Sequence, residues 1–200
     1  MPRDGPHAEV MTLLERTGAL KRGHFVLSSG LHSDRYCQCA ALFERPDAGA
    51  RVAELMRDRL ADQARPDGVV APALGGVLWG YELARVLGVR SLFAERVDGR
   101  LRLRRGFALR EGERVLLAED VVTTGGSVLE LADLVEGLGA GVVGVAAIVD
   151  RSRPEFVRRL AGRFPFHALV ELEFETYPAD DVPDELTAIP VERPGSREER

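Results

Sequence analysis

The chain has 200 residues, of which 45% are hydrophobic, and a net charge of −5 at pH 7. This length suits one α/β domain with a short extra lobe, and the hydrophobic content is ample for a core. The acidic charge does not favour non-specific binding of nucleic acid. No apolar run reaches the roughly eighteen residues of a membrane span, and the first residues lack the apolar stretch of a signal peptide. We therefore expect a cytoplasmic protein that binds neither nucleic acid nor membranes.

Hydrophobic spacing and turn residues predict strands that alternate with helices. In chain order, we expect a helix over 8–17, short strands over 24–27 and 35–39, and a helix over 46–64. A strand over 68–71, a helix over 76–87 and a hairpin of 92–97 with 101–103 follow, joined by an Asp98-Gly99 turn. The remaining elements are a strand over 115–118, a helix over 127–138, a strand over 141–149, a helix over 154–161 and a strand over 168–172.

This order predicts the α/β class, with a mainly parallel sheet and helices on both faces. We expect residues 1–45 to form an N-terminal helix and a small hood over the site, and residues 46–176 to form the α/β core. From Tyr177 onward Pro, Asp, Glu and Arg dominate, which predicts a loosely held tail over 177–200. In such sheets ligands bind at the carboxyl ends of the strands.

The stretch Arg-Val-Leu-Leu-Ala-Glu-Asp-Val-Val-Thr-Thr-Gly-Gly-Ser, residues 114–127, carries the clearest functional pattern. A buried strand leads through two carboxylates and a hydroxyl- and glycine-rich turn into a helix. Free N–H groups at that helix terminus, with the glycines and hydroxyls, are typical of a phosphate site. The carboxylates would accept hydrogen bonds from ribose hydroxyls, or attract Mg²⁺ bound to a diphosphate. The candidate ligands are Glu119, Asp120, Val121, Val122, Thr123, Thr124, Gly125, Gly126 and Ser127.

Two other nucleotide motifs can be excluded. Lys21 is the only lysine, so no Gly-x-x-x-x-Gly-Lys phosphate loop exists. A Gly-x-Gly-x-x-Gly string spans 139–144, but it follows a helix and enters a strand, the reverse of a dinucleotide-binding turn. Glycines alone would favour an ordinary turn at 123–127 with capping Thr and Ser. The acidic pair Glu119-Asp120 shortly before that turn favours a ligand-binding site over an ordinary turn.

Three further segments are candidates for the same site. Pro72-Ala73-Leu74-Gly75-Gly76 follows a strand and opens a helix, as a second anion loop or a simple turn. Residues 96–110 hold six arginines, including Arg96 and Arg100, against only Asp98. They suit diphosphate recognition, or form a solvated arm or a subunit contact. Ser28 and Tyr36 lie in a segment that forms either a hood over an aromatic base or a plain hairpin. Arg151, after the strand 141–149, would neutralise a substrate carboxylate or pair with Asp150.

The two cysteines, Cys37 and Cys39, lie two residues apart in a predicted strand and so face the same way. We expect buried or half-buried thiols rather than a disulfide, and no further His or Cys completes a metal site around them.

Residues 114–127 resemble the motif for phosphoribosyl pyrophosphate (PRPP) in the type I phosphoribosyltransferases. There the acidic pair binds the ribose hydroxyls and the following loop binds the 5′-phosphate. Residues 23–36, 72–76, 95–100 and 149–152 narrow the resemblance to the orotate phosphoribosyltransferases. It implies transfer of phosphoribosyl from PRPP to orotate, giving orotidine 5′-monophosphate and diphosphate in UMP synthesis. It also implies Mg²⁺ carried by PRPP rather than held directly by the protein, and a homodimer with shared sites.

The resemblance assigns roles to individual residues. Arg100 and Asp120 would be catalytic, Arg96 and Arg100 would bind PRPP, and Thr123 and Arg151 would contact orotate, with Ser28 and Tyr36 beside it. The loop of Ala73, Leu74, Gly75 and Gly76 would bind diphosphate, with a strained peptide bond at Ala73–Leu74.

The chain also departs from many orotate enzymes. They have lysines where Ser28 and Gly75 stand, and a Lys and a His in the mobile loop, whereas residues 91–113 contain neither. Arg96 and Arg100 are the expected replacements. A purine phosphoribosyltransferase and a PRPP-sensing regulator on the same fold are the alternatives.

Overall fold

The computed structural model describes residues 5–27, 29–152, 156, 160 and 162–194. Its centre is a six-stranded sheet in the order β5-β4-β3-β6-β7-β8, parallel except for β5, which pairs antiparallel with β4. The strands are β3 (Gly68–Pro72), β4 (Arg90–Val97), β5 (Arg100–Leu103), β6 (Arg114–Val122), β7 (Gly141–Asp150) and β8 (Phe166–Glu171). The α/β class and the mainly parallel sheet are thus confirmed.

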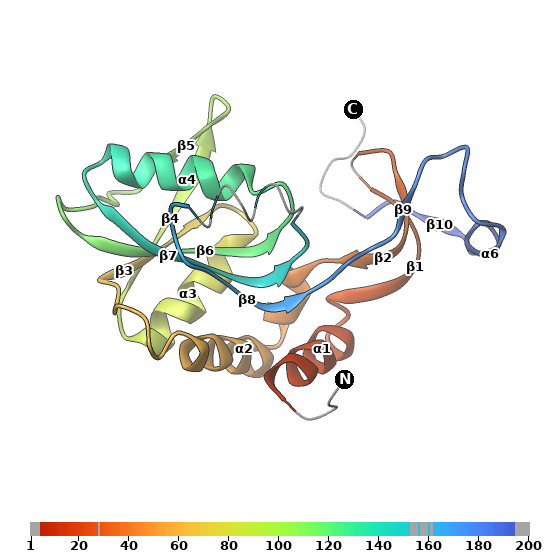
Figure 1. Cartoon of the computed structure of the whole chain (residues 1–200), viewed down its shortest axis with the longest axis horizontal. Coiled ribbons are helices and arrows are strands. Elements are labelled where there is room, and N and C mark those ends of the chain that lie inside the picture. The colour runs from red at the N-terminus through yellow and green to blue at the C-terminus, as the bar shows by residue number, and fades with distance from the viewer. Residues whose placement is uncertain (1–4, 28, 153–155, 157–159, 161, 195–200) are drawn as a thin grey trace.

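Helices cover both faces of this sheet, as Figure 1 shows. α1 (Pro6–Arg16), α2 (Pro46–Arg59) and α3 (Gly76–Leu87) lie on one face, and α4 (Gly126–Gly137) lies on the other. Strand alternation divides the apolar side chains between the faces: Leu116 and Ala118 pack toward α3, whereas Val115 and Leu117 pack toward α4. The near-continuous apolar runs of β6 and β7 follow from burial on both sides.

Several predicted boundaries differ from the structure. The strands expected over 24–27 and 35–39 begin earlier and span Leu20–Val26 and His32–Cys37. α2 ends at Arg59 rather than near residue 64, because Leu60 is the last buried residue of its apolar face and residues 61–65 are exposed. β6 extends to Val122, beyond the predicted end at Ala118, because its pairing with β7 continues to Val122↔Asp150. The helix expected over 154–161 falls mostly outside the described residues.

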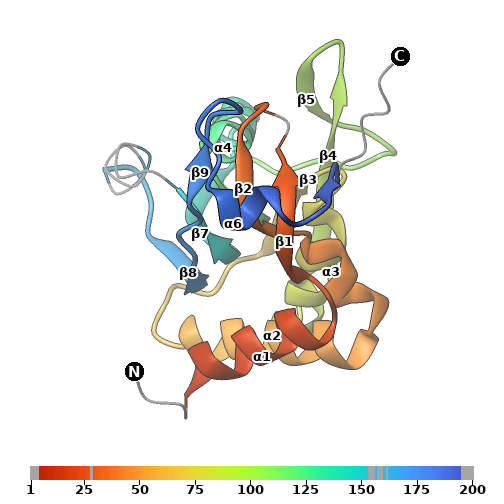
Figure 2. The ribbon, with the colours of Figure 1, turned by 90° about the vertical axis from the view of Figure 1, so that its right-hand side faces the viewer.

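A second, four-stranded sheet in the order β10-β1-β2-β9 forms the hood. β1 (Leu20–Val26) and β2 (His32–Cys37) come from the N-terminal part, whereas β9 (Thr176–Tyr177) and β10 (Val191–Glu192) come from the C-terminal part. Both views show these chain segments side by side, joined to the main body near β8 (Figures 1 and 2). The short helix η1 (Cys39–Glu44) leads from β2 back to α2.

The expectation of a loosely held tail is therefore wrong for residues 177–192. β9 pairs with β2, β10 pairs with β1, and the carbonyl of Ile189 lies 3.2 Å from Nδ1 of the buried His24. Leu186 in α6 (Asp184–Thr187) is buried as well. Composition indicated disorder, but backbone pairing at the edges of a hairpin does not depend on an apolar sequence. The division of the chain at residues 45 and 176 remains a prediction.

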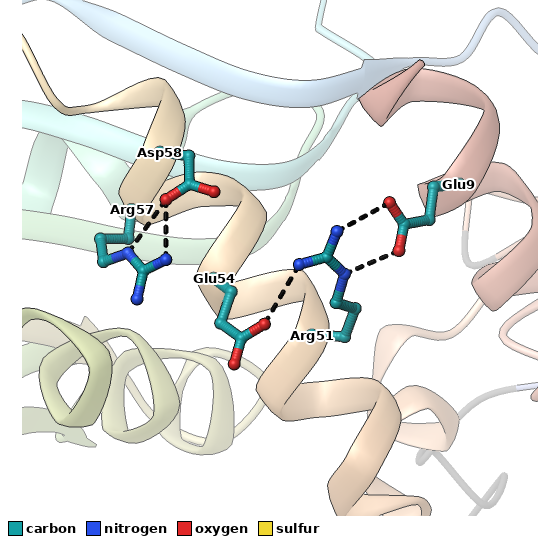
Figure 3. Close-up of polar contacts among 5 residues, drawn as sticks. All are labelled: Glu9, Arg51, Glu54, Arg57 and Asp58. Carbon is teal, nitrogen blue, oxygen red and sulfur yellow. Dashed lines mark hydrogen bonds and ion pairs between the residues drawn. The ribbon is translucent and has the colours of Figure 1, made fainter. Parts of the chain in front are cut away.

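α1 is fixed to α2 by ion pairs, drawn in Figure 3. Arg51 contacts both carboxylate oxygens of Glu9, at 2.7 and 3.0 Å, and Glu54 at 3.1 Å. These pairs lower the pKa of Glu9 and raise that of Arg51. Among the described helices, none is long and apolar enough to cross a membrane.

Candidate functional site

The carboxyl ends of four neighbouring strands meet at one edge of the central sheet. In register, Pro72 of β3 pairs with Ala94 of β4, and Val122 of β6 pairs with Asp150 of β7. The turn after β3, the β4–β5 hairpin, the turn after β6 and residues 151–152 therefore all leave the sheet on the same side. This geometry places the predicted site residues of the core at a single edge.

Glu119 and Asp120 lie in the second half of β6 rather than in the turn after it. Burial, and then the neighbouring Asp120, raise the pKa of Glu119 to about 9. The Asp120 carboxylate accepts a hydrogen bond from the N–H of Val121 at 2.9 Å. Val121 and Val122 belong to the strand, and their side chains pack into the core. Val122 is buried, so a ligand could reach it only through backbone groups, whereas Val121 is half-buried.

The turn between β6 and α4 contains two glycines with different constraints. Gly125 has a φ of +70°, and a Cβ there would lie 1.8 Å from the ring of the buried Phe156. Among the described residues, a Cβ on Gly126 would have only Thr124 Oγ1 within 4 Å, at 3.6 Å. Gly125 is thus required by the fold, whereas the space beside Gly126 is open.

The hydroxyl side chains of this turn face solvent at the start of α4. Thr123, Thr124 and Ser127 are exposed, and no side-chain cap closes the first turn of the helix. Thr124 Oγ1 accepts a long hydrogen bond from the N–H of Gly126, at 3.4 Å. The turn therefore has N–H donors and hydroxyls that could bind an anion, and its predicted role as a phosphate site stays a prediction.

The turn after β3 lies directly beside the acidic pair. An ideal Cβ on Gly75 would be 3.1 Å from both carboxylate oxygens of Asp120, and one on Gly76 would be 3.1 Å from the carbonyl oxygen of Ala118. The Ala73–Leu74 peptide bond is cis, at the position that the sequence resemblance indicated. Two glycine-rich turns and an acidic pair thus share one small region.

The arginine-rich hairpin rises from the same edge. Arg100, Arg102 and Arg104 are exposed on one face, as alternation predicted, while Leu101 is buried on the other. Arg96 is held by Glu130 of α4 at 2.8 Å, and Glu130 also accepts a hydrogen bond from the N–H of Leu101. Because Arg96 and Leu101 face each other one residue pair from the turn, the hairpin is anchored to α4 close to its tip. Figures 1 and 2 show this tip projecting beyond the body.

Arg151 follows β7 and lies where the hood meets the core. Its guanidinium is stacked on the ring of Phe174, with Cζ 3.8 Å from the ring centroid, and burial lowers its pKa. Its Nε is buried without a hydrogen-bond partner within the described part of the chain. The electrostatic influence of Arg151 on the pKa of Tyr36 places these two predicted residues near each other. Ser28, the other predicted hood residue, lies outside the described residues.

Asp150 does not pair with Arg151, so the alternative role as a strand-end ion pair is not supported within the described chain. The Asp150 carboxylate instead accepts a hydrogen bond from the N–H of Ser152 at 2.7 Å.

The two cysteines are buried free thiols, with sulfur atoms 3.8 Å apart. Their predicted state is confirmed, although Cys37 ends β2 and Cys39 begins η1. Across the described residues, no group of three or more His, Cys, Asp or Glu side chains is arranged to hold a metal ion.

Comparison with known proteins agrees with this geometry. Residues 38–160 match the family model described as the phosphoribosyl transferase domain. The chain belongs to the phosphoribosyltransferase family. It is 48% identical to an orotate phosphoribosyltransferase of Thermotoga maritima over 188 residues, covering 94% of this chain and 98% of that protein. It is 45% identical to one of Caldanaerobacter subterraneus over 192 residues, covering 94% and 97%.

Solved structures show the same phosphoribosyltransferase fold. Orotate phosphoribosyltransferase of Mycobacterium tuberculosis, in complex with inorganic phosphate, aligns with a TM-score of 0.68 and 26% identity, covering 84% of this chain and 96% of that one. Adenine phosphoribosyltransferase of Thermoanaerobacter pseudethanolicus aligns with a TM-score of 0.60 over 69% of this chain and 88% of that one. Its 22% identity supports the fold alone.

Two features of this phosphoribosyltransferase were not found from the sequence. The approach of Gly75 to Asp120 depends on the packing of α3 against β6, for which the sequence has no local signal. The stacking of Phe174 on Arg151 joins residues 23 positions apart. A lone phenylalanine between Glu173 and Glu175 resembles an ordinary edge residue.

Proposed function

We propose that the protein is an orotate phosphoribosyltransferase, which transfers the 5-phosphoribosyl group of PRPP to orotate. Relatives that are 45–48% identical over 94% of the chain carry that name. The structural observation that carries the proposal is Arg151, a half-buried arginine next to the turn after β6, whose buried Nε–H has no partner among the described residues. A half-buried cation without an ion-pair partner among the described residues favours an anionic ligand, and orotate has a carboxylate that purine bases lack.

The proposed roles follow from position. Glu119 and Asp120 accept hydrogen bonds from the ribose hydroxyls, and Thr123, Thr124, Gly126 and Ser127 hold the 5′-phosphate through hydroxyls and N–H groups. The Ala73–Gly76 turn binds the diphosphate, while Thr123, Arg151 and Tyr36 bind orotate. The bond broken is at the anomeric carbon, so an oxocarbenium-like transition state is expected. The protein then acts by positioning the reactants and stabilising the departing charge.

Arg100 is the proposed residue for diphosphate departure. Arg96 is engaged by Glu130, whereas the structure records no hydrogen bond or ion pair from Arg100 to any described residue. Mg²⁺ bound to PRPP would further neutralise the diphosphate. The nearby carboxylate of Asp120 fits a cation that enters with its substrate, and we place no residue in direct coordination.

The decisive experiment is turnover with PRPP and Mg²⁺, following the loss of orotate absorbance. Adenine, hypoxanthine, guanine and uracil serve as comparison bases. Steady conversion of orotate with none of a purine supports the proposal. Purine conversion would identify a purine enzyme, and PRPP binding without turnover of any base would favour a regulator.

We also propose a homodimer whose subunits complete each other's sites. Leu74, Leu78 and Tyr81 are 86%, 51% and 59% exposed and lie along one side of α3 and the turn before it. An apolar strip next to the diphosphate turn suits coverage by a second copy. The projecting hairpin would carry Arg100 toward the partner's PRPP.

Subunit mixing tests this arrangement. Arg100→Ala and Asp120→Asn proteins are expected to be nearly inactive alone. After subunit exchange, a mixed dimer regains one site with an intact hairpin and acidic pair, so activity should rise well above either parent. Confirmed exchange without recovered activity would contradict shared sites.

A further inference from the structure

Phe174 supports Arg151 without occupying its hydrogen-bonding edge. The Cζ atom of Arg151 lies 3.8 Å from the ring centroid, which is the distance of direct stacking. A guanidinium stacked in this way uses one face of its plane, and the N–H donors at its edge stay available. A carboxylate in the same place would neutralise the charge and accept those N–H groups. The ring therefore holds the cation in a conformation that remains ready for an anion.

The segment that carries Phe174 is fixed at both ends. Residues 172–175 cross from β8 in the central sheet to β9 in the hood. At the start of the segment, the N–H of Leu172 donates a hydrogen bond to the carbonyl of Asp150 at 2.8 Å. At its end, the buried Ser33 hydroxyl donates to the carbonyl of Glu175 at 2.9 Å, and Thr176 pairs with Ser33. Phe174 is half-buried against the main core cluster, whereas Glu173 and Glu175 are exposed.

These contacts tie both partners of the stack to the end of β7. Asp150, which accepts the Leu172 hydrogen bond, directly precedes Arg151, and the N–H of Arg151 donates to the carbonyl of Val122 at 2.8 Å. The backbones of the arginine and of the crossing segment are thus held relative to each other. The long arginine side chain would otherwise have several rotamers of similar energy, and ordering it at the moment of binding would cost affinity.

We infer that Phe174 is a positioning residue for recognition of the substrate carboxylate, because its ring fixes the Arg151 guanidinium before orotate binds. This inference rests on the proposed function, and it adds that the C-terminal segment, through Phe174, helps to set base specificity. Phe174 itself need not touch the substrate.

The test compares Phe174→Leu with Phe174→Tyr and with Phe43→Leu. Phe43 is a matched control, because it is also half-buried against the same core cluster but lies in η1. For Phe174→Leu we expect the KM for orotate to rise about 3- to 30-fold, the range that a lost cation–π contact implies. The KM for PRPP should stay within about twofold of the parent value, as should every constant of Phe174→Tyr and Phe43→Leu.

A double-mutant cycle separates positioning from general damage. Arg151→Met should itself raise the KM for orotate, and adding Phe174→Leu should then change it little, because the residue to be positioned is gone. If Phe174→Leu unfolds the protein, Phe174→Met is used instead, because its longer side chain also lacks an aromatic ring. Calorimetric binding of orotate in the presence of diphosphate gives a second readout.

Two results would overturn the inference. In one, Phe174→Leu raises the KM for orotate no more than Phe43→Leu does. In the other, its effect adds in full to that of Arg151→Met. Both results leave orotate turnover by the parent protein intact, whereas absence of that turnover would instead remove the proposed function.

Discussion

The charges of the α1–α2 layer and those at the carboxyl edge of the sheet are arranged in opposite ways. In the helix layer, Arg51 is bonded to two carboxylates, and each contact is partly exposed to solvent. At the sheet edge, Glu119 and Asp120 lie side by side without a cation within ion-pair distance in the described chain, and Arg151 rests on an aromatic ring. Paired surface charges support the fold modestly, whereas partly buried charges without counter-charges cost stability and are retained for a ligand. Substitutions in the two regions should therefore have opposite consequences.

The acidic pair should show the largest effect. Glu119→Gln combined with Asp120→Asn removes both ionisable carboxyl groups but keeps the shapes, so the fold should hold and the melting temperature should not fall. Turnover of orotate and PRPP should drop at least about 100-fold, the scale of losing a charge-stabilising group at a reacting centre. Turnover assays and thermal melts on the same preparation test this expectation. Normal turnover of the double variant would remove the acidic pair from the site.

Gly125 and Gly126, in the turn after β6, allow the same comparison of fold stability with ligand binding at two adjacent positions. Gly126→Val should weaken PRPP binding at least tenfold with little change in stability, because the added side chain fills open space where the phosphate is proposed to bind. Gly125→Ala should instead lower the free energy of unfolding by about 2–4 kcal/mol, from a left-handed φ and the Phe156 ring.

Calorimetry with PRPP and with orotate, beside chemical denaturation, separates these outcomes. If Gly126→Val weakened both ligands equally, the turn would have no dedicated phosphate role. If Gly125→Ala kept full stability, the fold would not be what requires this glycine.

The sequence was sufficient where function depends on a short run of residues. The strand–turn–helix at 114–138, the Asp98-Gly99 hairpin and the end of α3 at Gly88 are local patterns, and the structure has them as expected. For the hood, the sequence predicted the N-terminal hairpin but not the C-terminal strands. β9 and β10 are only two residues long and form by pairing with β2 and β1, so they have no sequence pattern of their own. The stack of Phe174 on Arg151 likewise depends on the path of residues 172–175 from β8 to β9, which the local sequence does not indicate.

Glu119 also predicts a dependence of stability on pH. Its pKa is raised from 4.5 in the unfolded chain to about 9 in the folded protein. The folded state therefore binds the extra proton between these values, and the contribution of Glu119 to stability falls as pH rises toward 9. Glu119→Gln removes this dependence, so its melting temperature should exceed that of the parent by an amount that grows from pH 5 to pH 9. Melts in metal-free buffer measure the difference, and a constant or shrinking difference would contradict the raised pKa.

We expect the smallest effect on stability at Glu9, where the dependence of stability on pH has the opposite sign to that of Glu119. The hydrogen bonds from Arg51 lower the pKa of Glu9, so its contribution to stability is present above about pH 4.5 and is lost as pH falls through the folded-state value. Glu9→Gln should cost no more than about 1 kcal/mol, because both side chains are more than 40% exposed and salt screens the pair. The loss should shrink at high salt and disappear at low pH, and orotate turnover should not change. Glu54→Gln, which removes the single contact instead of the paired one, should cost less. A loss for Glu9→Gln that persisted at low pH would mean that α1 depends on packing at this position and not on the charge.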